Sequence, residues 1–210
     1  IADFKYGVKF NVSDATAKIL EYPYEGDFDN QSINSYYNGK KLGEIWGYET
    51  KGLAQSNEEM TSWLEKNKPN WGSNWQAGDV MYKDLNDDNK VTSGAGTLKD
   101  HGDLKRIGNS TPRYNFGINL NAEWKGIDFS VFFQGVMKCD WYPGQGQPYF
   151  WGAIGDLWQS TCFKEHLDYW SENNKNAYYP KPYLNGDAQK NQRTQTRYLQ
   201  SAAYMRCKNI

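Results

Sequence analysis

The sequence has 210 residues, a formal net charge of −1 and a mean hydropathy of −0.90. No apolar run reaches the roughly 18 residues that a transmembrane helix needs, which excludes a helical membrane span. Lysine and arginine are dispersed, so the charge pattern gives no sign of a nucleic-acid partner. Aromatic residues make up 16%, including nine Trp and 16 Tyr, which is typical both of membrane-barrel girdles and of sugar-binding surfaces.

The first part of the chain contains two predicted strands. Residues 4–12 alternate between apolar and polar side chains, which predicts a strand with one apolar face. Residues 15–22 fit either a return strand or a short turn, and residues 25–35 are polar enough to predict a loop. Residues 41–49 are expected to form a short strand.

A helix is predicted next. Ser56 is followed three residues later by Glu59, a capping-box pattern, and apolar residues then recur at helical spacing, so we expect a helix over residues 57–67. Residues 71–78 are predicted to form a loop and residues 79–83 a short extended segment.

The clearest pattern of the chain lies in residues 114–135, YNFGINLNAEWKGIDFSVFFQG. Two alternating arms flank Lys125-Gly126, which predicts a hairpin of two long strands and a tight turn. Each arm has the roughly 9–11 residues that a tilted strand needs to cross a bilayer. One apolar face, one polar face and aromatic ends are typical of a transmembrane β-barrel hairpin. A soluble antiparallel sheet packed on one side also alternates, so the hairpin alone leaves both alternatives open.

The rest of the chain is predicted to be loops and one further strand. Residues 138–151 and 173–195 are predicted to be loops, and residues 157–170 fit either a strand or an irregular helix. Residues 196–210 return to an alternating pattern. Long loops between long strands favour a large barrel over a compact soluble domain. Because both ends of the sequence look like strand, we expect an internal piece of a longer chain.

One motif is typical of a cation site. Residues 84–90 read DLNDDNK, and oxygen ligands at alternate positions of a tight turn suit Ca²⁺. Position six of such a loop needs a positive φ, which Asn89 tolerates, while position twelve is alanine, so this is not an EF-hand. An acidic turn without metal fits the sequence equally well. The candidate ligands are Asp84, Asn86, Asp88, the backbone carbonyl of Lys90, and a closing carboxylate farther along, for which Asp100 and Asp103 are the candidates.

Nothing in the sequence indicates an enzyme. The nucleophile-elbow, zinc-protease, P-loop and dinucleotide-binding motifs are all missing. His101 and His166 lie far apart without a ligand cluster. Three widely spaced cysteines argue against a disulfide framework and a zinc site: Cys139, Cys162 and Cys207.

Four segments together resemble the C-terminal barrel region of SusC/RagA-type TonB-dependent outer-membrane transporters. They are residues 78–91, 103–135, 167–182 and 196–210, which occur in matching order and spacing. The asparagine at 89 departs from the glycine usual in the family, and residues 92–102 look like an insertion. Asp103, five residues before Gly108, matches the family's closing Asp.

This resemblance implies a fold and a function. It implies an all-β fold: a segment of an antiparallel, 22-stranded transmembrane barrel with long extracellular loops and one short helix. Residues 1–210 would be part of the barrel, without the plug domain and the remaining strands. The expected function is TonB-dependent import of oligosaccharides, or of peptides, across the outer membrane of a Gram-negative cell. The expected partners are TonB, a SusD-like surface lipoprotein and membrane lipid; the sequence does not identify the substrate.

The predicted orientation of the hairpin follows from its two faces. The apolar set is expected to face lipid: Phe116, Ile118, Leu120, Phe129, Val131 and Phe133. The polar set is expected to face the lumen or plug: Asn119, Asn121, Glu123, Ser130 and Gln134. Trp124, Trp141, Tyr142 and Trp151 are assigned to a girdle or to loop packing, with substrate stacking as the alternative. The competing functions are a soluble carbohydrate-binding β-domain with an aromatic sugar platform, and a secreted glycan-active enzyme.

Overall fold

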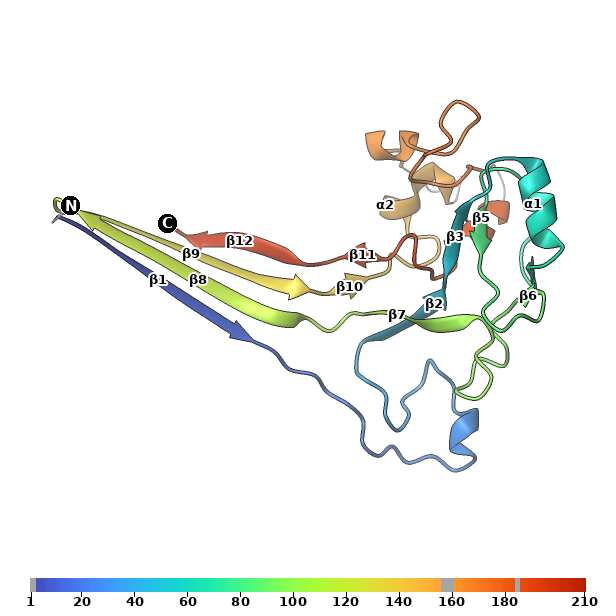
Figure 1. Ribbon diagram of the computed structural model, residues 1–210, viewed down its shortest axis with the longest axis horizontal. Coiled ribbons are helices and arrows are strands. Elements are labelled where there is room, and N and C mark those ends of the chain that lie inside the picture. Colours follow the sequence, from blue (N-terminus) through green and yellow to red (C-terminus); the bar gives the residue numbers. More distant parts are fainter. Residues whose placement is uncertain (1–2, 156–160, 184–185) are drawn as a thin grey trace.

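The computed structural model describes residues 3–155, 161–183 and 186–210. Two regions are evident in Figure 1: a long, narrow sheet, and a rounder body of short strands, helices and loops at one end of it. We call these the sheet region and the loop region. Across the described residues, no helix combines the length and the apolar character that a membrane crossing requires.

The sheet region contains four antiparallel strands in the order β1-β8-β9-β12. Their bounds are Phe4–Ser13 for β1, Arg113–Trp124 for β8, Ile127–Lys138 for β9 and Tyr204–Asn209 for β12. The strand predicted over residues 4–12 and the hairpin predicted over residues 114–135 are therefore confirmed. Residues 196–210 were predicted to form a strand, but only Tyr204–Asn209 join this sheet, as β12. The residues before them belong to the loop region.

The tight turn between β8 and β9 also agrees with the prediction. Lys125 and Gly126 both have positive φ, 49° and 84°. Two consecutive residues of this kind form the turn whose twist matches that of a hairpin. In Figure 1 this turn lies at the end of the sheet that is farthest from the loop region.

The loop region is built from small two-stranded pairs. Three pairs are antiparallel: β2 (Glu44–Tyr48) with β7 (Leu104–Asn109), β3 (Thr50–Leu53) with β5 (Val80–Tyr82), and β10 (Asp140–Trp141) with β11 (Gln200–Ser201). One pair is parallel: β4 (Lys68–Pro69) with β6 (Lys90–Val91). Strands β2 and β5 lie within the segments predicted at 41–49 and 79–83, whereas β7, which has no clear alternation, was not predicted.

Helix α1 (Asn57–Leu64) begins where the capping box predicts. The hydroxyl of Ser56 accepts a hydrogen bond from the backbone N–H of Glu59 at 3.2 Å. This satisfies one of the free donors at the helix start. The helix ends at Leu64, three residues before the predicted end at 67, and Met60 and Trp63 point into the core.

Short helices occupy segments that were predicted to be loops. Residues 138–151 contain α2 (Pro148–Trp151), where Gln147 caps the first turn and proline takes the first helical position. The prediction of a single short helix is therefore wrong, because the described residues contain both α1 and α2. The remaining helical turns are of the 3₁₀ type: η1 (Phe28–Asn30), η2 (Gly152–Ile154), η3 (Lys164–Leu167) and η4 (Gly186–Gln192). Residues 15–22 form no strand and make only an isolated bridge from Lys18 to Lys41. Of residues 157–170, residues 157–160 lie outside the described part. Residues 161–170 contain the 3₁₀ turn η3 and an isolated bridge at Tyr169 but no strand, which favours the irregular helix there.

The hydrophobic core lies in the loop region and is largely aromatic. Its buried members come from β2, β3, α1, β5, β6, α2 and the segments around residues 170–179 and 198, and include Trp63, Tyr82, Trp151, Trp170, Tyr179 and Tyr198. Ring pairs such as Trp151 and Tyr198, whose centroids are 4.9 Å apart, meet edge to face. This geometry suits the ring quadrupoles and adds to the burial of apolar area. The loops therefore have a core of their own.

Candidate functional site

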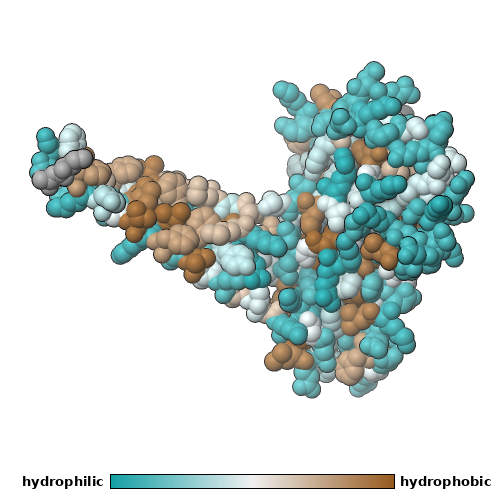
Figure 2. Space-filling model, in the orientation of Figure 1, coloured by the Kyte–Doolittle hydropathy of each residue, from teal (hydrophilic) through white to brown (hydrophobic). Residues whose placement is uncertain are grey.

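The first candidate surface is the apolar face of the sheet region. Pairing places Val8 opposite Leu120 and Leu120 opposite Val131, and the same alignment continues along all three strands. All six residues predicted to face lipid lie on this face: Phe116, Ile118, Leu120, Phe129, Val131 and Phe133. Many of its large side chains are exposed, for example Val8 at 63% and Ile127 at 66%. Figure 2 shows hydrophobic residues collected along the sheet region.

The opposite face of the same sheet is polar. The five residues predicted to face the lumen all lie there: Asn119, Asn121, Glu123, Ser130 and Gln134. Lys5 and Glu123 form an exposed ion pair across β1 and β8 at 3.1 Å. Gly7 leaves the space that the amide of Asn121 fills, because a Cβ there would clash with it. Phe132 and Val136 are the apolar exceptions on this face.

Both outer edges of the sheet are unpaired in the described part of the chain. Strand β1 pairs with β8 alone, and β12 pairs with β9 alone. Each edge therefore presents a row of backbone N–H and C=O groups that need partners. In lipid such groups are very costly unless a neighbouring strand binds them.

The four aromatic residues that were assigned to girdle or loop packing differ in position. Trp124 is 50% exposed beside the hairpin turn, and Trp141 is 46% exposed in β10. Trp151 is fully buried in the loop region, and its indole N–H donates to the carbonyl of Gly144 at 2.8 Å. Tyr142 packs against the same core and donates to the carbonyl of Arg193 at 2.7 Å. Trp151 and Tyr142 are thus loop-packing residues.

The Asp-rich turn is held by its own first carboxylate. One oxygen of Asp84 accepts from the backbone N–H groups of Asn86 and Asp87, and the other accepts from that of Asn89 at 2.8 Å. Asn89 has a φ of 64°, which confirms the positive φ predicted at this position. Asp88 accepts from the backbone N–H of Lys90 at 2.8 Å.

Asp103 lies well after this turn in the sequence, but its side chain binds the backbone of the turn. It is fully buried and accepts hydrogen bonds from the backbone N–H groups of Leu85 at 2.6 Å and Thr92 at 2.7 Å. Burial raises the pKa of its carboxyl above the ordinary value, and the negative charges of Asp84 and Asp88 act in the same direction. The other candidate, Asp100, instead accepts from the backbone N–H of Ala95 at 3.0 Å.

The fit of this turn to a cation is incomplete. A buried carboxylate with two more acidic groups nearby is the kind of charge that a bound cation would offset. Across residues 3–155, 161–183 and 186–210, however, no three His, Cys, Asp or Glu side chains form a group that could hold a metal ion. The assignment of Asp84, Asn86, Asp88, Lys90 and Asp103 as Ca²⁺ ligands therefore stays a prediction.

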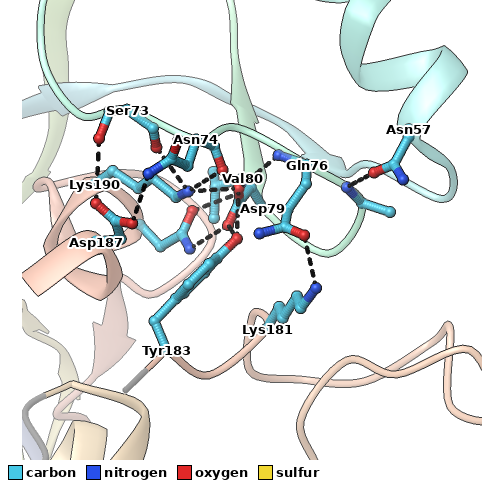
Figure 3. A network of polar contacts seen from close by, with 12 residues as sticks. Asn57, Ser73, Asn74, Gln76, Asp79, Val80, Lys181, Tyr183, Asp187 and Lys190 are labelled. Atoms are coloured by element: carbon cyan, nitrogen blue, oxygen red, sulfur yellow. Dashed lines mark hydrogen bonds and ion pairs between the residues drawn. The ribbon is translucent and has the colours of Figure 1, made fainter. Parts of the chain in front are cut away.

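A buried ion pair that the sequence analysis missed connects two distant segments of the loop region. Asp79 and Lys190 are both fully buried, and Lys190 Nζ lies 2.8 Å from Asp79 Oδ2 (Figure 3). The ammonium also donates to the carbonyls of Ser73 at 3.0 Å and Asn74 at 2.8 Å. Its charge lies 4.2 Å from the ring centroid of Tyr183. All three ammonium donors thus have partners.

The carboxylate of Asp79 is equally well bound. It accepts from the hydroxyl of Tyr183 and the amide of Asn191, both at 2.8 Å, and from the backbone N–H of Gln76 at 2.9 Å. Burial and the adjacent Asp79 charge raise the pKa of Tyr183 well above its ordinary value, so this hydroxyl remains a donor. Since every group is satisfied internally, the network fixes the loops and leaves no free group for catalysis.

Comparisons with known proteins agree with this architecture. No family model matches the chain. It is 24% identical to TonB-dependent receptor P3 of Formosa agariphila over 219 residues, which covers 99% of this chain and 19% of that protein. Its fold is similar to a chain in the solved structure of the RagAB peptide transporter, with a TM-score of 0.58 and 18% identity. That alignment covers 98% of this chain and 20% of the other.

These findings confirm the resemblance to SusC/RagA-type TonB-dependent receptors. The chain spans about a fifth of the length of both proteins it matches. The all-β part of the fold prediction, with antiparallel sheets and few helices, is confirmed as well. Neither protein is an enzyme by its name, which agrees with the lack of catalytic motifs.

Proposed function

From this likeness to SusC/RagA-type receptors, we propose that the sheet region is part of the wall of a TonB-dependent barrel in the outer membrane. The observation that carries the proposal is a four-stranded sheet with an exposed apolar face, an opposite polar face and two unpaired edges. A soluble sheet would bury one face against a second layer of structure. Lipid on one side and a polar lumen or plug on the other satisfy both faces.

The dimensions of the sheet support this proposal. Strands β1, β8 and β9 contain 10, 12 and 12 residues. A tilted strand of about 9–11 residues crosses the hydrocarbon core of a bilayer. The missing partners of the two edges would be the neighbouring strands of the same barrel, for which we propose 22 strands and closure around an N-terminal plug.

The asymmetry between the two ends of the sheet supports an orientation. One end has the two-residue turn at Lys125-Gly126, and the other end leads into the whole loop region (Figure 1). Outer-membrane barrels have short turns on the periplasmic side and long loops on the outside. We therefore place the loop region outside the cell.

The biological function that follows is nutrient import powered by TonB. The loop region would lie beneath a SusD-like surface lipoprotein, and the imported substrate would be an oligosaccharide or a peptide. The solved neighbour is titled a peptide transporter, whereas the relative in Formosa agariphila is named only as a receptor. Within this function we also propose that the Asp-rich turn binds a structural Ca²⁺ ion, which would offset the buried charge of Asp103.

The experiment that tests the barrel proposal uses the intact parent receptor. Outer membranes are isolated, extracted with detergent, and run on a gel with and without boiling. We expect the receptor in the detergent extract, with a folded band that shifts on boiling. A protein that stays in the aqueous phase and shows no shift would contradict the proposal and would favour the soluble carbohydrate-binding domain.

A further inference from the structure

The loop region has two adjoining hollows that share one ridge. The larger has a volume of about 390 Å³ and the smaller about 200 Å³, and Trp71 and Arg193 line both. The guanidinium of Arg193 lies 5.3 Å from the ring centroid of Trp71, so the two side chains stack. We call the two hollows and this ridge the Trp71 groove. An extended ligand could occupy both hollows and cross the ridge.

Among the described residues, Arg193 forms no ion pair within 4 Å, and the carboxylate of Asp187 lines the same smaller hollow. Arg193 is exposed, and its guanidinium packs against the ring of Trp71. Some cations of the loop region differ from it: Lys190 pairs with Asp79 at 2.8 Å, and Arg106 pairs with Glu44 at 3.2 Å. Arg197 forms no ion pair among the described residues either, but its guanidinium donates to the carbonyls of Ala177 and Tyr178. A stacked guanidinium with free donors is well suited to a carboxylate or sulfate group, which it can bind through two parallel hydrogen bonds.

The rest of the groove lining combines aromatic rings with amide and hydroxyl groups. The aromatic members are Trp46, Tyr48 and Trp71, the apolar members Ile33 and Leu104, and the uncharged polar members Asn34, Asn70, Ser93, Gln145, Gln189 and Thr194. The smaller hollow is also lined by Lys190 and by Asp187, whose carboxylate accepts from the hydroxyl of Ser73 at 3.2 Å and the amide of Asn74 at 3.1 Å. Ring faces pack against the apolar side of a pyranose, and amides and hydroxyls can both donate to and accept from sugar hydroxyls. This composition favours a hydroxyl-rich ligand.

The backbone of the groove offers little to a peptide. An extended peptide is often bound by pairing with an exposed strand edge. Strand β2, which carries Trp46 and Tyr48, is paired along one edge and bonded at its C-terminal residue on the other. One edge pairs with β7, and on the other Tyr48 donates to the carbonyl of Thr194 at 2.8 Å and accepts from Thr196 at 3.0 Å. A peptide that paired with β2 would therefore meet an edge already occupied at Tyr48.

We propose that the Trp71 groove binds an acidic oligosaccharide, with Arg193 holding the carboxylate or sulfate group. The ring of Trp71 supports the guanidinium, and the surrounding amides and hydroxyls bind the sugar hydroxyls. The inference rests on the proposed import function, because it names the substrate class of that transporter. Residues 186–195, which include the buried Lys190, would then also determine which substrate binds.

Calorimetry on the intact receptor in detergent tests this inference. The probes are tetragalacturonate and its methyl ester, which has the same sugar chain without the negative charges, together with a κ-carrageenan tetrasaccharide and its unsulfated counterpart. We expect at least one acidic member to bind about tenfold or more tightly than its neutral counterpart. Arg193→Gln should remove that preference, and Arg193→Lys should retain part of it, because lysine keeps the charge and loses the paired hydrogen bonds.

The matched control is Arg206→Gln. Arg206 also stacks on an aromatic ring, Tyr204, with 4.3 Å between guanidinium and ring centroid, but it lies on β12, outside the groove. This variant should bind like the unchanged receptor. Binding of neither acidic probe, equal binding of acidic and neutral probes, or an Arg193→Gln variant with unchanged affinity would each overturn the inference.

Two further measurements separate the possible failures. Preferential binding of tetraglutamate that depends on Arg193 would reject the oligosaccharide in favour of a peptide. A receptor that shifts on boiling but binds no acidic sugar leaves the barrel proposal intact and rejects the groove alone. A receptor without that shift would contradict the import function itself, and with it the inference.

Discussion

The sheet region and the loop region satisfy their side chains in opposite ways. In the sheet region, large apolar residues such as Phe10 and Ile127 are 56% and 66% exposed, and two strand edges have no partner among the described residues. In the loop region, Trp151 and Tyr198 are fully buried, and even a lysine finds an internal carboxylate. The loop region is therefore stabilised by its own contacts, whereas the sheet region depends on what surrounds it.

This difference changes what a mutation is expected to report. A substitution in the loop region tests contacts within the chain, and its effect should be similar in any solvent that keeps the parent protein folded. A substitution in the sheet region tests the environment on one face, and its effect should depend on that face.

The largest effect is expected for Asp79→Ala. The variant leaves the ammonium of Lys190 buried without a counter-charge and leaves the hydroxyl of Tyr183 and the amide of Asn191 without their acceptor. Breaking a buried pair in this way costs about 3–5 kcal/mol. Limited proteolysis of the intact receptor should show rapid cleavage within residues 71–83 or 186–195, while the boiling shift of the barrel stays unchanged.

Lys190→Met sharpens this test. Asp79 then keeps its bonds to Tyr183, Asn191 and Gln76, so the loss should be smaller than for Asp79→Ala. Lys175→Ala, at an exposed loop position, is the control and should not alter the cleavage pattern. Equal cleavage in all three variants would show that the network does not hold the loops.

The next largest effect is expected on the apolar face of the sheet. Ile118 and Asn119 are neighbours near the middle of β8 and point to opposite faces. Ile118→Arg should cost about 2–4 kcal/mol if it faces lipid near the bilayer midplane, and Asn119→Arg much less. Refolding titrations of the intact barrel in lipid vesicles measure both.

The same comparison predicts a gradient along the strand. Phe129 lies on the apolar face but only two residues from the start of β9, beside the hairpin turn. Phe129→Arg should therefore cost less than Ile118→Arg, because the penalty falls toward the interface. Equal, small costs for Ile118→Arg and Asn119→Arg would contradict the assignment of the faces.

A calcium titration addresses the Asp-rich turn of the loop region. If the turn binds Ca²⁺, the ion at about 100 times its dissociation constant stabilises the native state by about 2.7 kcal/mol. Differential scanning of the intact receptor should give a higher melting temperature in CaCl₂ than in EDTA. Asp88→Asn should reduce that difference, and Asp100→Asn should retain it, since Asp100 binds Ala95 instead. A melting temperature that is the same in both buffers would reject the site.

The pH dependence of this effect has a defined sign. Burial raises the pKa of Asp103 above its ordinary value of 3.8. Without calcium, the unfolded chain loses the Asp103 proton first, so this residue's contribution to stability declines as the pH rises from about 3.8 through the raised pKa. Bound Ca²⁺ favours the ionised carboxylate. The stabilisation by calcium should therefore increase with pH over that range.

The contrast between the regions also explains what the sequence could predict. Strands β1 and β8 alternate with a period of two, and β9 does so except at Phe132 and Val136, so these strands and their faces were predictable from local pattern alone. The ion pair of Asp79 and Lys190 joins residues 111 positions apart, and no local pattern links them. Arg193, which directly follows η4, and Trp71 are likewise far apart in the sequence, so their contact and the groove beside it were not predictable either.

In the loop region, the sequence predicted those features that depend on interactions between residues close together in the chain. Ser56 begins α1 because its hydroxyl reaches a backbone N–H three residues away. Asn89 takes a positive φ because the Asp-rich turn requires it. In contrast, α2 has only four residues, which is too few for a helical period to appear. Its proline and aromatic residues were therefore predicted to belong to a loop. Local capping and turn chemistry thus remain predictable, and the packing of loop against loop does not.

The smallest effects are expected at the hairpin turn, where the sheet region depends on backbone conformation alone. Lys125 has a φ of 49°, a value that a lysine adopts at some cost, and Gly126 follows with 84°. Lys125→Asn should stabilise the hairpin by about 0.5 kcal/mol, because Asn-Gly is favoured in this turn. Gly126→Ala should destabilise it by about 1 kcal/mol. Both changes leave the two faces untouched, so refolding titrations in vesicles and in detergent should give the same differences, unlike those for Ile118→Arg. A solvent-dependent effect at the turn would indicate that lipid contacts extend to this end of the sheet.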